Sequence, residues 1–154
     1  MDYVIVKWIH ILSSTLLFGT GLGSAFYMFF TSLTKDTRAI AIVVRNVVFA
    51  DWLFTTPTII LQPLTGFYLV HLAGFPLSSQ WVVWSVVLYL IAGLCWLPVV
   101  WLQIQMKKMA QLAVVNNTVL PDRYWQYLKI WVGLGIPAFA ALVIIFYLMV
   151  AKPN

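Results

Sequence analysis

Residues 81–106 read WVVWSVVLYLIAGLCWLPVVWLQIQM and contain no charged side chain. A segment of this length and polarity can cross a bilayer as a helix, which takes about 20 residues at about 1.5 Å per residue. Three more apolar segments that are long enough extend over about residues 3–30, 47–73 and 130–150. Because open strands leave unpaired backbone groups in lipid, the sequence predicts an all-α, polytopic membrane protein built as a four-helix transmembrane bundle.

The composition agrees with a chain that lies mostly in lipid. Of the 154 residues, 63% are hydrophobic and 8% are charged, against about 25% charged in an average soluble domain. Such a chain has too few charges to cover the surface of a water-soluble enzyme or a secreted disulfide scaffold. The length fits a single domain over residues 1–154. The lipid bilayer is the first expected partner, and the net charge of +5, which forms no basic stripe, does not indicate nucleic acid.

The positive charges are distributed unevenly between the two sides of the predicted bundle. Those near the loops after the first and third spans are Lys35, Arg38, Arg45, Lys107, Lys108, Arg123 and Lys129. The loop after the second span has none, and the ends of the chain carry Lys7 and Lys152. Cytoplasmic loops carry an excess of Lys and Arg, so we expect the first and third loops in the cytoplasm and both termini outside. The first span exceeds the apolar core of a cleaved signal peptide, about 7–15 residues, so we expect it to be retained.

The chain has two histidines, His10 in the first span and His71 near the end of the second. These spans run in opposite directions, so both rings are expected near the outer side of the membrane. Two imidazoles on neighbouring antiparallel helices could hold the iron of a b-type haem from opposite sides. On an ideal helix, Ser14 and Gly21 share the face of His10. Gly66 lies in the second span, and these small residues would leave room for a flat cofactor.

A second interpretation of the two histidines is structural. A polar stripe follows the second span, and its members are Asp51, Thr55, Thr58, Gln62 and Thr65. At about 100° per residue, His71 lies about 180° from Gln62 and is turned away from this stripe. His10 would then be an interfacial residue hydrogen-bonded to a neighbour, and His71 a boundary residue exposed to water. The amide and hydroxyl groups of the stripe are expected to bond to another helix, or to carbonyls freed by Pro57 and Pro63.

Asp51 is the one acidic residue expected deep enough in the membrane to be costly. It could relay a proton to a redox site, which makes it the candidate catalytic residue. It could instead pin two helices together, for example by pairing with Arg45. Residues with the spacing of zinc ligands, a catalytic triad or a phosphate-binding loop do not occur, so hydrolase and kinase chemistry has no basis in this sequence.

Several short stretches and single residues resemble those found in a family of small bacterial membrane proteins. They are Lys7-Trp8-Ile9-His10-Ile11-Leu12, Phe18-Gly19, Arg45, Asp51, Pro57, Gly66 and Ala151-Lys152-Pro153. Over nearly its whole length the chain is similar to the predicted integral membrane family known as domain of unknown function 2269. It is more distantly similar to the HemJ-type protoporphyrinogen oxidases, which bind b-type haem, and to the CopD membrane domain. The resemblance implies that His10 is a haem ligand, and that the protein lies in the bacterial cytoplasmic (inner) membrane.

Two functions are consistent with these features. The first is a membrane-embedded b-type haem protein that transfers electrons or oxidises a quinol- or porphyrinogen-like reductant, with His10 and His71 as iron ligands. Lys7 could pair with a haem propionate, and a quinone, a membrane redox protein or a second copy of the chain would be its partner. The alternative is a non-enzymatic accessory or assembly subunit of a larger membrane complex, without a cofactor. The sequence leaves open whether the protein is an enzyme.

Overall fold

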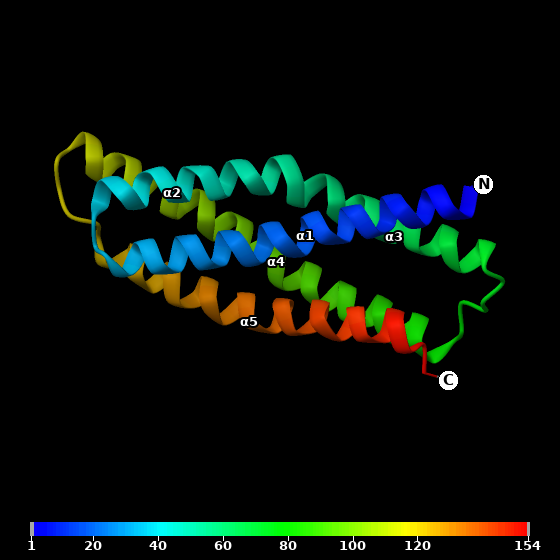
Figure 1. The fold of residues 1–154 in the computed structure, drawn as a ribbon. Helices are drawn as coiled ribbons and strands as arrows, with labels where there is room; N and C mark the ends of the chain where they lie inside the picture. Colours follow the sequence, from blue (N-terminus) through cyan, green and yellow to red (C-terminus); the bar gives the residue numbers. More distant parts are fainter. Residues whose placement is uncertain (1, 154) are drawn as a thin grey trace.

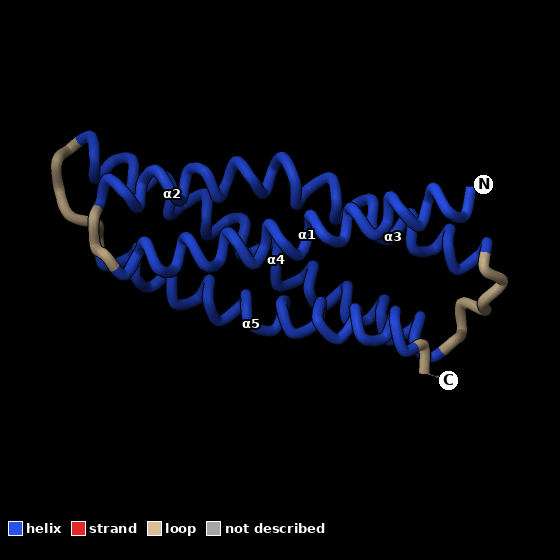
Figure 2. The backbone as a smooth tube through the Cα atoms, viewed as in Figure 1, coloured by secondary structure: helices blue, strands red, loops and turns tan. Residues whose placement is uncertain are grey.

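The computed structural model describes residues 2–153, and every regular element in that range is a helix. The elements are α1 (Asp2–Leu33), α2 (Thr37–Ala50), η1 (Asp51–Thr55), α3 (Thr56–Leu72), α4 (Gln80–Val115) and α5 (Asp122–Ala151). Because α2, η1 and α3 follow one another without a break, they form one long column, and only short connections are non-helical (Figure 2). Within the described residues, four helical segments are long and apolar enough to cross a membrane, which confirms the predicted fold class.

The columns run along one another and alternate in direction (Figure 1). Both ends of the chain lie at one end of the bundle together with the α3–α4 connection, residues 73–79, and we call this the terminal end. The α1–α2 and α4–α5 connections, residues 34–36 and 116–121, lie at the other, which we call the basic end. The two loops flanked by most of the cations therefore share an end, as the sequence predicts. Which end faces the cytoplasm stays a prediction.

At the basic end the helices extend beyond the apolar segments. The carboxylate of Asp36 caps α2, because it accepts hydrogen bonds from the backbone N–H groups of Arg38 at 2.9 Å and Ala39 at 3.2 Å. After α4, Asn117 adopts a left-handed conformation with a φ of 53°, which turns the chain toward α5. Polar capping groups, which hydropathy does not register, therefore set the helix ends here.

The second column contains one irregular turn. In η1 the N–H of Thr56 donates to the carbonyl of Asp51, five residues earlier, so the turn is π-helical. Pro57 explains its position, because proline has no N–H and its ring collides with the carbonyl four residues before it. The hydroxyl of Thr56 donates to the same carbonyl at 3.0 Å. Such turns are frequent at functional sites, and this one carries two buried polar residues, Asp51 and Thr55.

Side chains pack densely at the basic end and sparsely elsewhere. The larger core cluster comprises Met28, Ile40, Val44, Val47, Leu102, Met106, Ala110, Ala113, Leu120, Tyr124, Leu128 and Trp131. A smaller cluster near the terminal end comprises Val70, Trp81, Val82 and Leu148. Between them α4 and α5 stay together, whereas α1 meets α5 over a short stretch only. The space that this leaves in the middle of the bundle holds the candidate site.

Candidate functional site

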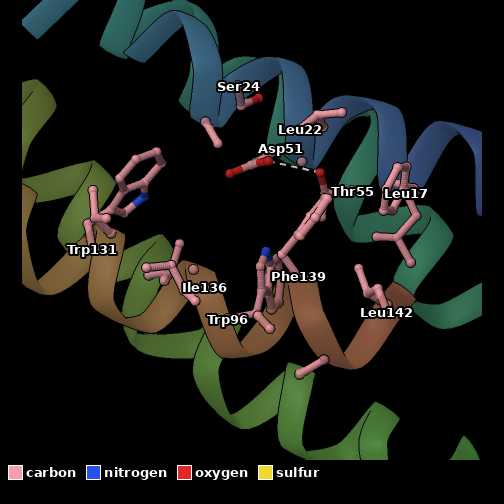
Figure 3. A pocket seen from close by; sticks show the side chains of 18 of the residues that line it. Leu17, Leu22, Ser24, Asp51, Thr55, Trp96, Trp131, Ile136, Phe139 and Leu142 are labelled. Carbon is pink, nitrogen blue, oxygen red and sulfur yellow. Dashed lines mark hydrogen bonds between the residues drawn. The ribbon is translucent and has the colours of Figure 1, made fainter. Parts of the chain in front are cut away.

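A cavity of about 530 Å³ lies between α1 and the α4–α5 pair, with η1 at one side (Figure 3). Its wall is built mostly from Leu, Ile, Phe, Ala and Gly residues. Its volume falls within the range of about 300–1,000 Å³ that is usual for small-molecule sites, and bundles commonly bind ligands between their helices. This cavity is therefore the candidate functional site.

Three buried polar side chains interrupt the apolar wall. Asp51 and Thr55 come from η1 and Gln103 from α4, and their exposed fractions are 7%, 4% and 3%. The Thr55 hydroxyl donates to Oδ1 of Asp51 at 2.8 Å, and the Gln103 side chain also interacts with this carboxyl group. Figure 3 shows the second carboxyl oxygen on the cavity side. A molecule in the cavity would therefore meet a carboxyl group held in place by two neutral neighbours.

Trp96 of α4 and Trp131 of α5 line the same cavity. Their Nε1 atoms are buried and find no hydrogen-bond acceptor within residues 2–153. Figure 3 shows both indole nitrogens turned toward the space in front of Asp51. The cavity thus offers two unused hydrogen-bond donors as well as a carboxyl group.

Aromatic side chains close the cavity toward the terminal end. Phe18 of α1 stacks on Phe139 of α5 with ring centroids 5.0 Å apart, and it meets Phe146 edge-on at 5.4 Å. Nearby, the Tyr89 hydroxyl donates to the carbonyl of Ile59 at 2.5 Å. This carbonyl lacks its helical donor because the residue four positions later is a proline. Phe18 and Tyr89 also line a second cavity of about 40 Å³, so they are part of the partition between the two spaces.

The wall between α1 and α5 is incomplete. Leu22, Phe26 and Ile136 line the cavity and are also exposed on the outside of the bundle, by 49%, 53% and 65%. The outer surface of a transmembrane bundle faces hydrocarbon at this depth. These exposed side chains indicate an opening between α1 and α5, through which an apolar molecule could enter from lipid without passing through water.

His10 lies outside the main cavity and holds α1 against α3. Its Nδ1 is 2.7 Å from Oγ1 of Thr65, whose own proton goes to the carbonyl of Leu61 at 2.6 Å. In the tautomer that carries its proton on Nδ1, the ring donates to this oxygen and Nε2 has the lone pair. Gln62 donates to the carbonyl of His10 at 2.9 Å and to the hydroxyl of Ser13. We call these residues the α1–α3 clasp. Gln62 and Thr65 of the polar stripe thus bond to another helix, whereas Thr58 bonds to carbonyls of its own column.

The structure does not place His71 beside His10. His10 contacts α3 at Thr65 and Gly66, whereas His71 is exposed near the end of that helix. Five residues beyond Gly66 correspond to a rise of about 7.5 Å and a rotation of about 140°. The His71 ring therefore leaves α3 at a different height, and on a different face, from the part of α3 that His10 contacts. This arrangement does not bring the two rings together, and their role as paired iron ligands stays a prediction.

The other residues expected around a haem do not share one cavity. A Cβ built on Gly66 would lie 3.4 Å from Cε1 of His10, so the imidazole itself fills that position. Ser14 bonds to a carbonyl of its own helix at 2.7 Å and lines the cavity of about 40 Å³, far too small for a porphyrin. Gly21 lines the main cavity instead, and Lys7 is exposed over an aromatic ring of its own helix. The residues around His10 in this arrangement do not fit a haem.

Asp51, the candidate catalytic residue from the sequence, does reach the main cavity. Its contacts are with Thr55 and Gln103, while Arg45 is exposed, so neutral partners replace the suggested ion pair. A role in proton relay stays a prediction.

Sequence reasoning did not identify several of the residues that line the cavity together with Asp51. Trp96, Trp131 and Gln103 all belong to this group. A tryptophan near a span end is typical of an interfacial anchor, so Trp131 gave no sign that it points inward. Gln103 did offer a signal, because an amide within an apolar span needs a partner.

Comparison with curated proteins and with solved structures gave no match. A family model matches residues 4–153, which is nearly the whole described chain. The family is described as a predicted integral membrane protein, in agreement with the four apolar helical segments. The chain therefore belongs to the predicted integral membrane protein family DUF2269.

Proposed function

We propose that this protein binds a lipid-soluble small molecule within the membrane, with the polar head of that molecule against Asp51. The observation that supports the proposal is the cavity of about 530 Å³, whose wall is apolar except in the region around Asp51. Transmembrane helices associate largely through close packing. A purely structural bundle would therefore be expected to fill such a space rather than keep it open.

The wall indicates which class of molecule would fit. The carboxyl group of Asp51 accepts a hydrogen bond from a hydroxyl group and, when protonated, donates one to a carbonyl. The surrounding phenylalanine, leucine and isoleucine side chains offer apolar contact only. This combination favours an apolar molecule with a small oxygen-bearing head, and it disfavours ions and strongly hydrated solutes.

Photolabelling tests the proposal. The probe is dodecanol that carries a diazirine, applied to the purified protein in lipid nanodiscs. We expect labels on α1 and α5 residues that line the cavity. Gly93→Leu and Gly135→Leu should reduce this labelling several-fold, because a Cβ at either position meets open space and a leucine would occupy the cavity.

Gly19→Leu is the matched control, since Gly19 is equally unobstructed but does not line the cavity. Labels spread evenly over the outer surface, and unchanged by the two cavity-filling variants, would overturn the proposal.

Haem-dependent electron transfer stays a separate prediction. One observation favours it: Nδ1 of His10 is hydrogen-bonded to Thr65, and a hydrogen bond at the second ring nitrogen is common among metal-binding histidines. A porphyrin would require α1 to move away from Gly66. A Soret band that His10→Ala removes would support this function, and its absence after growth with ample haem would exclude it. The cofactor-free accessory subunit predicts instead a stoichiometric protein partner on purification.

A further inference from the structure

The two buried indole groups place a further constraint on the ligand. Trp131 is 6% exposed, and Nε1 of both Trp96 and Trp131 lacks an acceptor in the described part of the chain. A buried N–H without a partner is unfavourable, and the hydrocarbon core supplies no water to satisfy it. Phenylalanine would fill a similar space without this cost. The N–H groups therefore call for an acceptor that comes from outside the chain.

The two donors converge although they come from different helices. Trp96 belongs to α4 and Trp131 to α5, and Figure 3 shows their nitrogens directed toward the same space as Asp51. An indole N–H donates and cannot accept, so the ligand has to provide the lone pairs. In a lipid-soluble molecule, the groups that supply strong acceptors without carrying charge are carbonyl oxygens.

We infer that the cavity recognises a lipid-soluble carbonyl compound whose oxygens accept hydrogen bonds from Trp96 and Trp131. This inference rests on the proposed ligand-binding function and adds the chemistry of the head group. Quinones with an apolar tail and diacylglycerols are membrane molecules that carry a pair of carbonyl oxygens on an apolar body. Asp51, beside the two donors, offers the third hydrogen-bonding position.

Competition against the diazirine-labelled dodecanol tests the inference. The competitors are decyl-1,4-benzoquinone, dioctanoylglycerol and decylbenzene, which has the same tail as the quinone and no oxygen. A hydrogen bond between groups in a membrane protein changes affinity by about threefold, so two bonds should give a preference of about tenfold. We therefore expect one of the two carbonyl compounds to compete at about one tenth of the concentration that decylbenzene needs. Which of them does so identifies the source of the carbonyl groups.

Trp96→Phe and Trp131→Phe remove one donor each and keep an aromatic ring in the wall. Each should reduce the preference for the carbonyl compound about threefold, and the double variant should abolish it, while competition by decylbenzene stays the same. Trp84→Phe is the control, because Trp84 is exposed on α4 and does not line the cavity. If one variant fails to fold, the other still tests its own donor, and the wild-type comparison of matched competitors is independent of both.

The possible outcomes distinguish a failure of the carbonyl inference from a failure of the proposed binding function. Equal competition by all three compounds in the wild-type protein would overturn the carbonyl inference and leave the binding function in place. A preference that survives in the double variant would likewise overturn the role of the indole groups. If no compound displaces the probe and labelling does not concentrate at the cavity, the proposed function itself fails.

Discussion

The basic end and the middle of the bundle contain similar apolar side chains in different arrangements. At the basic end, Ile40, Met106 and Tyr124 have exposed fractions of 0%. In the middle, Leu22 and Ile136 line a cavity and are also exposed to lipid. Both regions are rich in hydrophobic residues, so hydropathy does not account for the difference between a filled core and an open one.

Shape and hydrogen bonding account for it instead. In lipid, apolar side chains gain little from burial alone, so helices stay together where they fit closely or share polar contacts. At the basic end, small residues such as Ala110 and Ala113 let helices approach one another. There the Tyr124 hydroxyl also lies 2.9 Å from Oγ of Ser32, which donates to the carbonyl of Met28 at 2.7 Å. The densely packed basic end can therefore stabilise a bundle whose middle remains open.

Met106→Ala should show the largest effect on stability. Its side chain is fully buried in the larger core cluster, so truncation leaves a void and should lower the free energy of unfolding by about 2–3 kcal/mol. Ile136→Ala removes a side chain that mainly contacts lipid, and should cost less than about 0.5 kcal/mol. Unfolding in mixed detergent micelles, followed by circular dichroism, measures both. Equal losses would contradict the contrast between the two regions.

Most of the fold could be predicted from the sequence because span formation depends on local properties. A run of about 20 apolar residues has one stable conformation in lipid, whatever its neighbours. The polar stripe was informative for the same reason, since Gln62 and Thr65 need partners in the membrane and find them on α1. The π-helical turn at η1 was not predicted, although Pro57 marks its place.

The site was harder to predict because it depends on rotation about helix axes. α4 and α5 are apolar on all sides, so periodicity does not distinguish inward-facing residues such as Trp96 and Trp131 from lipid-facing ones. The two histidines show the same difficulty. Membership of neighbouring helices and similar depth suggested a pair, whereas the structure places His10 against Thr65 and leaves His71 exposed near the end of α3.

Asp51→Leu tests whether the polar location in the middle serves binding rather than stability. Removal of the buried carboxyl group relieves its cost in an apolar region but leaves the Gln103 side chain without this partner, so the free energy of unfolding should change by less than about 1 kcal/mol. Thr55 would keep a partner if its hydroxyl turned to a carbonyl of its own helix, as that of Thr58 does at 2.7 Å. The same variant should weaken competition by the carbonyl compound and leave that by decylbenzene unchanged.

Asp51→Asn, which keeps a hydrogen-bonding group, should lie between Asp51→Leu and the wild-type protein in both measurements. A stability loss of more than about 1 kcal/mol in Asp51→Leu would instead indicate that the carboxyl group pins η1 to α4.

Tyr124→Phe tests the hydrogen bond at the basic end. The hydroxyl is buried and bonded to Ser32, so its removal should cost about 1 kcal/mol. Tyr147→Phe is the control because that side chain is 67% exposed, and it should leave the unfolding midpoint unchanged. Ligand competition should be the same in both variants, since neither residue lines the cavity. A change in competition by Tyr124→Phe would show that the dense end and the open middle are coupled.

Thr65→Val tests the α1–α3 clasp and should have the smallest effect among the variants that remove a hydrogen bond. The substitution keeps the shape of the side chain and removes the oxygen that accepts from Nδ1 of His10, while the bonds from Gln62 remain. A single hydrogen bond between transmembrane helices contributes about 0.6 kcal/mol, so a loss of that size is expected. Thr15→Val is the control, because its hydroxyl bonds only within α1.

A double-mutant cycle of Thr65→Val with His10→Ala should give a coupling energy of about 0.6 kcal/mol, because each change removes the same bond. A coupling energy above about 2 kcal/mol would place the main stabilising contact of the bundle at the clasp rather than in the packed core. The basic end would then not be the main source of stability, since a region with few buried side chains would contribute as much to the free energy of unfolding as the densest one.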